Sequence, residues 1–115
     1  VSWQLSGPYE FFGMCQCSRC RKATGAAFAT NLFVKANQFK WLTGESEVGE
    51  YVMEAPNTFG NAFCKTCGSR APRFSSARGW MMAPLGSTMQ TPEIEPTLVC
   101  AKDHTDWFKK LEEMI

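Results

Sequence analysis

The stretch Cys15-Gln-Cys-Ser-Arg-Cys20 places three cysteines at C-x-C-x-x-C spacing, and Cys64-Lys-Thr-Cys-Gly68 adds a C-x-x-C pair later in the chain. Thiolate sulfur is the ligand that zinc prefers at tetrahedral sites, and a two-residue gap lets a tight turn direct two sulfurs at one ion. Glycine after the second cysteine of the pair suits such a turn, because it takes a positive φ without strain. The spacing therefore predicts zinc as a cofactor. The predicted metal ligands are Cys15, Cys17, Cys20, Cys64 and Cys67.

The first cluster admits two kinds of metal site. In an extended segment Cys15 and Cys17 point to the same side, and Cys20 can return to them from the start of a helix. Three protein ligands leave a fourth position open for water or substrate, as in a catalytic site, whereas four ligands make a closed structural site. A closed site built from two of these cysteines with the later C-x-x-C pair fits the spacing equally well. Disulfides are a third arrangement, but cysteines this close in sequence bond poorly to one another and no secretory segment precedes them.

Length and composition favour one soluble domain over residues 1–115. The hydrophobic content of 44% is enough for a core, and the formal net charge is only +1. No run of Lys or Arg forms a stripe for phosphates, so we expect no nucleic-acid partner. Apolar stretches fall well short of the roughly 20 residues that cross a bilayer, so we expect no membrane partner and a cytoplasmic location.

Short β-rich segments separated by turns predict a mainly β domain. Apolar, β-branched and turn-forming residues place strands at 1–5, 9–15, 26–34, 48–54, 58–64, 70–74, 80–85 and 97–101. The segments 48–54 and 58–64 predict a hairpin around 55–57. Helical turns are expected at 18–24, ending at Gly25, and a terminal helix at 106–114.

Several motifs together resemble one known family. The run from Cys15 to Gly25 followed by Ala-Ala-Phe-Ala, then Phe63-Cys-Lys-Thr-Cys-Gly-Ser-Arg70, is similar to the glutathione-dependent formaldehyde-activating enzyme (GFA) family, which includes centromere-protein-V-like proteins. Pro84-Leu-Gly-Ser87 and Asp106-Trp-Phe108 extend the resemblance over nearly the whole chain.

The resemblance implies a fold and a chemistry. The fold is a β-tent of several coiled antiparallel sheets, with short helical turns and a C-terminal helix. The chemistry is carbon-sulfur lyase activity on a hydroxymethyl adduct of glutathione. In those relatives the C-x-C-x-x-C cysteines hold an open zinc beside the substrate, a role that would fall to Cys15, Cys17 and Cys20. The later pair helps to build a closed structural zinc, which would use Cys64 and Cys67.

Two departures from the family pattern bear on these expectations. Relatives usually begin with another C-x-C-G before a strand that residues 1–5 resemble, and this sequence starts after it. The domain is therefore expected to lack the family's N-terminal strand that carries this C-x-C pair. An edge left unpaired there could bind a second copy, which makes a homodimer a hypothesis. Gln16 stands where many relatives have His, and an amide cannot shuttle protons near neutral pH.

Other residues are assigned from their chemistry. Arg19, Arg21 and Lys22 could hold glutathione carboxylates, with Arg21 first because the family motif carries a basic residue after the third cysteine. Cys100 is expected to be a buried strand residue, and His104 to face solvent. Six aromatic residues are expected mostly in the core, with one or two walling a pocket, namely Phe28, Phe33, Phe39, Trp41, Phe59 and Phe63.

Two functions follow as hypotheses. The first is a zinc-dependent carbon-sulfur lyase acting on a small glutathione- or thiol-aldehyde adduct. The second is a non-catalytic binding module stapled by zinc, and four protein sulfurs on one ion would favour it. A nucleic-acid-binding zinc ribbon fits the spacing and the charge balance less well.

Overall fold

The structure is a computed structural model that describes residues 1–54 and 59–115. Its strands are β1 (Ser2–Leu5), β2 (Phe11–Cys15), β3 (Ala29–Lys35), β4 (Phe39–Thr43), β5 (Val48–Val52), β6 (Gly60–Cys64), β7 (Arg73–Ser75), β8 (Trp80–Pro84) and β9 (Thr97–Val99). Its α-helices are α1 (Ser18–Thr24) and α2 (Phe108–Met114). Single 3-10 turns are η1 (Ala36–Gln38), η2 (Glu45–Glu47), η3 (Leu85–Ser87) and η4 (Ala101–Asp103). The predicted mainly β domain with a C-terminal helix is confirmed.

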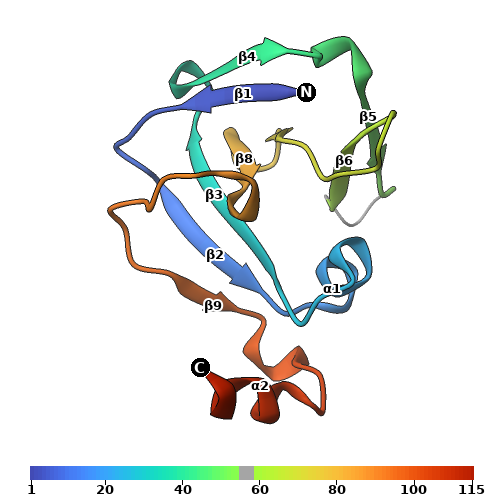
Figure 1. Cartoon of the computed structure of the whole chain (residues 1–115), viewed down its shortest axis with the longest axis vertical. Coiled ribbons are helices and arrows are strands. Elements are labelled where there is room, and N and C mark those ends of the chain that lie inside the picture. Colours follow the sequence, from blue (N-terminus) through green and yellow to red (C-terminus); the bar gives the residue numbers. More distant parts are fainter. Residues whose placement is uncertain (55–58) are drawn as a thin grey trace.

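Three sheets make up the described fold (Figure 1). A five-stranded sheet has the order β7-β8-β3-β2-β9, and β1-β4 and β5-β6 form two-stranded sheets. Strand pairs are antiparallel except that β9 joins β2 in parallel register, Cys15 opposite Val99. In Figure 1 the β1-β4 sheet lies at one end of the molecule and α2 at the other.

The core is centred on β3. This strand pairs with β2 on one side and β8 on the other, so it is the middle strand of the five-stranded sheet and both of its edges are hydrogen-bonded. Leu32 and Phe33 are 1% and 3% exposed, and Val34 is fully buried. Burial of each apolar side chain contributes about 1.5 to 3 kcal/mol, so this run of apolar residues specifies the central strand.

Helix α1 forms as the sequence predicts. Cys17 is its N-cap residue, and Gly25 ends it with a φ of 65° in the left-handed region that glycine takes without strain. The Thr24 hydroxyl donates a hydrogen bond to the Cys20 carbonyl at 2.8 Å, which also stabilises the last turn of the helix. The helix therefore fixes Cys17 and Cys20 relative to each other.

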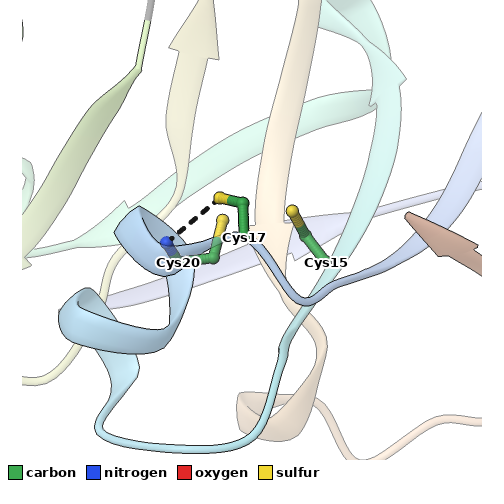
Figure 2. Close-up of side chains that lie close together, drawn as sticks. All are labelled: Cys15, Cys17 and Cys20. Carbon is green, nitrogen blue, oxygen red and sulfur yellow. Dashed lines mark hydrogen bonds between the residues drawn. The ribbon is translucent and has the colours of Figure 1, made fainter. Parts of the chain in front are cut away.

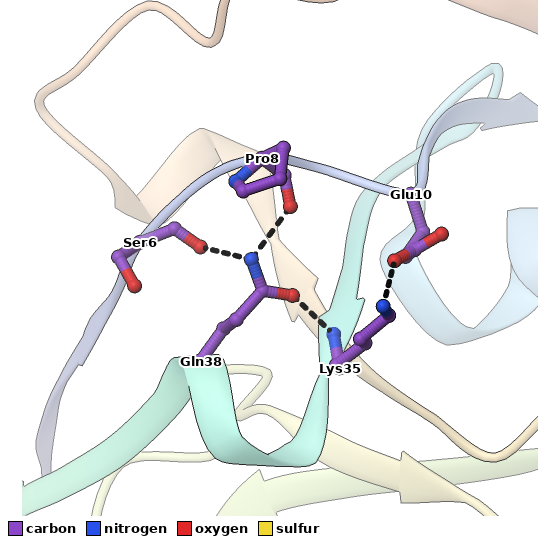
Figure 3. A network of polar contacts seen from close by, with 5 residues as sticks. All are labelled: Ser6, Pro8, Glu10, Lys35 and Gln38. Atoms are coloured by element: carbon purple, nitrogen blue, oxygen red, sulfur yellow. Dashed lines mark hydrogen bonds and ion pairs between the residues drawn. The ribbon is translucent and has the colours of Figure 1, made fainter.

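The first two predicted strands belong to different sheets. β1 pairs with β4, whereas β2 pairs with β3 and β9. The link between them, which contains a cis Gly7-Pro8 bond, is held by Gln38 of η1 (Figure 3). The Gln38 amide donates to the carbonyls of Ser6 at 3.0 Å and Pro8 at 2.6 Å, and its oxygen accepts from the Lys35 N–H at 2.8 Å.

Later elements differ from their predicted bounds for local reasons. β5 and β6 pair as expected, while the predicted turn at 55–57 lies outside the described residues. The strand predicted at 70–74 is shortened to β7, since Pro72 offers no N–H for a ladder, and Arg70 makes only an isolated bridge to Phe63. Within the described residues, no helix has the length and apolar character that crossing a membrane requires.

Candidate metal centre and cavity

Cys15, Cys17 and Cys20 converge at the junction of β2 and α1 (Figure 2). Cys15 is the last residue of β2, Cys17 caps α1, and Cys20 lies in the first turn of the helix. Their three sulfurs all lie within 4.8 Å of one another. A tetrahedral zinc with Zn–S bonds of ~2.3 Å needs sulfurs about 3.8 Å apart, so small side-chain rotations bring this set onto one ion. Three thiols of this geometry fit a zinc ion with one position left for a non-protein ligand.

The thiols are held in unlike environments. Burial raises the pKa of Cys15 and, more strongly, that of Cys20. Burial also acts to raise the pKa of Cys17, but hydrogen bonds outweigh it, first that from the Cys20 backbone N–H at 3.4 Å, and the net pKa is lowered. Cys17 is therefore the thiol most ready to become a thiolate before a metal binds.

The cluster opens into a cavity of about 480 Å³. Its floor is one face of the five-stranded sheet, since alternate residues of β2 and β3 point into it. The beginning of α1 and the segment around β6 supply further lining residues. The lining residues are Phe11, Gly13, Cys15, Cys17, Arg19, Cys20, Asn31, Phe33, Phe59, Gly60, Arg70, Arg73, Ser75, Arg78, Trp80, Met82, Val99 and Cys100. The open side of the cysteine cluster thus borders a space large enough for a small molecule.

One or two of the six aromatic residues named from the sequence are expected to wall a pocket. Phe33 and Phe59 do so, and Phe33 also packs against Phe11 and Trp80 at centroid distances of 5.6 and 5.9 Å. The prediction that Cys100 is a buried strand residue is wrong, because Cys100 is exposed. β9 ends at Val99, and Cys100 turns to a φ of 54° to begin η4, which brings it to the edge of the cavity.

The comparisons with known proteins bear on this site. A family model described as glutathione-dependent formaldehyde-activating enzyme matches residues 1–104. The chain belongs to this family. Among curated protein sequences none matches it. A solved structure titled as a Rhodobacter sphaeroides protein superposes with a TM-score of 0.61 over 82% of this chain and 88% of that one, at 15% identity, and so shows the shared fold.

The second cysteine pair of this GFA-family chain lies apart from the first cluster. No metal-binding group of three or more found among the described residues includes Cys64 or Cys67. The pair sits on a tight turn in which the Gly68 N–H donates to the Cys64 carbonyl at 2.7 Å, with Gly68 at the predicted positive φ of 79°. Cys64 is buried and Cys67 exposed. A zinc role for this pair stays a prediction.

The basic residues of the family motif take different positions. Arg19 lines the cavity, whereas Arg21 is absent from the lining and its Nε donates to the Gln16 carbonyl at 3.0 Å. The glutathione-carboxylate role predicted for Arg21 stays a prediction. The structure adds Arg70, Arg73 and Arg78 to the lining. No pattern in the sequence points to Arg73 or Arg78, whereas Arg70 ends the family motif that begins at Phe63.

Gln16 and His104 lie outside the lining of the cavity. Gln16 is fully buried, and no described protein atom hydrogen-bonds its side-chain amide. As the residue between two cavity-facing cysteines of an extended segment, it points to the other face of the chain. His104 is exposed, as predicted, with Nδ1 2.7 Å from the Thr105 carbonyl.

Proposed function

We propose that this protein is a zinc-dependent carbon-sulfur lyase acting on a glutathione- or thiol-aldehyde adduct. The observation that carries the proposal is a three-thiol cluster that opens into a cavity and that no fourth ligand from the described residues closes. A closed structural site would need no such cavity. Membership of the glutathione-dependent formaldehyde-activating family supports a substrate of this class.

The proposed reaction interconverts a hydroxymethyl thiol adduct, which is a hemithioacetal, and the free thiol and aldehyde from which it forms. In the cleavage direction the hydroxyl loses its proton to solvent, the carbonyl double bond forms, and the electron pair of the broken C–S bond returns to sulfur. Addition reverses these steps. Both directions need the sulfur to exist as a thiolate, so stabilising the thiolate is the task of the site.

The three cysteines would hold the metal that supplies this stabilisation. A zinc ion bound there would act as a Lewis acid that lowers the pKa of a thiol in its fourth position. Cys15, Cys17 and Cys20 would set its coordination number, and the aromatic residues of the cavity would exclude water from the sulfur. No His, Asp or Glu belongs to the described lining, so proton transfer is assigned to solvent.

Exchange spectroscopy tests the proposal directly. With ¹³C-formaldehyde and glutathione at equilibrium, zinc-supplemented protein should accelerate interconversion of the adduct and its components above the spontaneous rate. Cys17→Ser should abolish the acceleration. Cys67→Ser is the matched control, because Cys67 is exposed and outside the cavity lining, and it should retain the acceleration. If zinc-loaded protein gives only the spontaneous rate while retaining the metal, the lyase proposal fails. That result would favour the hypothesis of a non-catalytic binding module.

A further inference from the structure

Arg70 is a half-buried cation with no carboxylate partner among the described residues. Its Nε donates to the neutral amide oxygen of Asn61 at 2.9 Å, and the described ion pairs do not include it. Burial lowers the pKa of its guanidinium, which reflects the cost of keeping that charge away from water. Buried charges are ordinarily paired, so a guanidinium left in this state at a cavity wall is suited to an anion that enters the cavity.

Arg78 reaches the same cavity from the turn between β7 and β8. Its guanidinium carbon lies 5.1 Å from the centroid of the Phe33 ring, in a cation–π arrangement. The residue is exposed, and no described carboxylate pairs with it. A cation–π contact of this kind helps to hold the guanidinium at the ring while leaving its N–H groups able to bind a carboxylate.

The charge of the lining favours the same kind of ligand. The described lining contains four arginines and no acidic residue. Arg73 is bonded to Glu50 at 3.1 Å, so its charge is already compensated within the protein. Arg19 lies at the exposed beginning of α1, next to the thiol cluster. Arg70 and Arg78 are thus two guanidinium groups of the lining that no described carboxylate pairs with and that can recognise a carboxylate of the ligand.

We propose that Arg70 and Arg78 form a carboxylate-binding subsite, which makes the protein selective for thiol adducts that carry a carboxylate remote from the sulfur. This inference rests on the proposed function for the placement of the sulfur at the cysteine cluster. The carboxylate would be held by charge-assisted hydrogen bonds from the two guanidinium groups, while apolar parts of the ligand contact Phe11, Phe33 and Trp80.

Binding measurements test this subsite without requiring turnover. Zinc-supplemented protein is titrated calorimetrically with glutathione and with glutathione diethyl ester, which has the same thiol but no carboxylates. Glutathione should bind to the wild-type protein about tenfold or more tightly, because hydrogen bonds to charged groups are worth that factor. The preference should shrink as salt is added.

Variants assign the preference to residues. Arg78→Ala, at an exposed position, and Arg70→Lys should each bring the ratio of the two affinities towards one. Lys40→Ala removes an exposed positive charge from β4, outside the cavity lining, and should keep the wild-type ratio. Circular dichroism verifies that each variant is folded, and Arg78→Ala keeps the test decisive if Arg70→Lys does not fold.

Three results would overturn the subsite. One is equal binding of the two probes to the wild-type protein. Another is a preference that survives both changes but disappears in Arg21→Ala, which would assign the carboxylate to Arg21. The third is an Arg70→Lys variant that loses zinc and keeps the preference, which would assign Arg70 to the thiol cluster. A preference that depends on both arginines without any acceleration of exchange would retain the subsite and remove the lyase proposal.

Discussion

The backbone N–H of Cys20 donates a hydrogen bond to Sγ of Cys17 at 3.4 Å. The sulfur of one predicted metal ligand therefore caps the helix that carries another. The same contact contributes to the lowered pKa of Cys17. Helix α1 and the thiol cluster are consequently one structural unit, so changes at Cys17 affect both metal binding and helix stability.

This coupling separates two substitutions at Cys17. Serine is a favourable N-cap residue and alanine is not, and the loss of an N-cap typically costs about 0.5 to 2 kcal/mol. In metal-free protein, Cys17→Ala should be less stable than Cys17→Ser by about that amount, while both lose the thiol. Urea denaturation with chelator present measures the difference. Equal stabilities would show that position 17 does not act as a cap.

The Gln38 side chain should stabilise the fold through its hydrogen bonds, although it lies near the surface. Its side chain makes three hydrogen bonds, of which two join η1 to the link between β1 and β2 and the third accepts from the Lys35 N–H (Figure 3). Gln38→Ala should lower the free energy of unfolding by about 1 to 2 kcal/mol. Asn37→Ala, at the exposed preceding position, is the control and should be nearly neutral. Similar denaturation midpoints for both variants would argue against this role.

Cys67 should be the most readily alkylated of the predicted ligands. It is exposed, and its hydrogen bond with the Ser69 hydroxyl at 3.2 Å lowers its pKa below the ordinary value of 9.0. A lower pKa means more thiolate at a given pH, so the midpoint of its alkylation rate should fall below pH 9.0. Mass-resolved iodoacetamide labelling of metal-free protein measures this midpoint.

Two comparisons check the cause of that reactivity. Ser69→Ala should move the Cys67 midpoint upward, because the hydroxyl contact is lost. Cys20 is buried, and its burial raises its pKa, so it should react with iodoacetamide after Cys67. Labelling of Cys20 before Cys67 would contradict the account.

Gly60 should not tolerate a side chain. A Cβ there would collide with the guanidinium of Arg73, which is bonded to Glu50 and whose side chain is only 9% exposed, so it has little room to move. Gly60→Ala should therefore destabilise the fold by about 1 to 3 kcal/mol. Gly86→Ala is the matched control, since its Cβ would meet no atom within 4 Å. Thermal melts of the two variants should differ clearly, and equal melts would refute the predicted collision.

Local features of the fold and site were predictable from sequence because they depend on neighbouring residues. The helix at Ser18–Thr24, its end at Gly25 and the positive φ at Gly68 follow from capping and glycine chemistry. The convergence of the first three cysteines follows from strand and helix periodicity. These inferences needed no knowledge of tertiary structure.

Long-range features were not predictable in the same way. The pairing of β1 with β4, and of β9 with β2 in parallel, is decided by packing between distant segments. The cavity arginines Arg70 and Arg78 come together only when the segment after β6 and the turn between β7 and β8 line the same cavity. The prediction for Cys100 is wrong because its apolar neighbours favour a continuing strand, whereas β9 ends one residue earlier, at Val99.

The most direct test of the central claim is zinc content by elemental analysis of protein purified without chelator. The claim is that Cys15, Cys17 and Cys20 form a metal site that does not require the later pair. Cys17→Ser should lose zinc from this site, while Cys64→Ser and Cys67→Ser should retain it. Loss of the same zinc in Cys17→Ser and in both variants of the pair would instead indicate one shared closed site and contradict the claim.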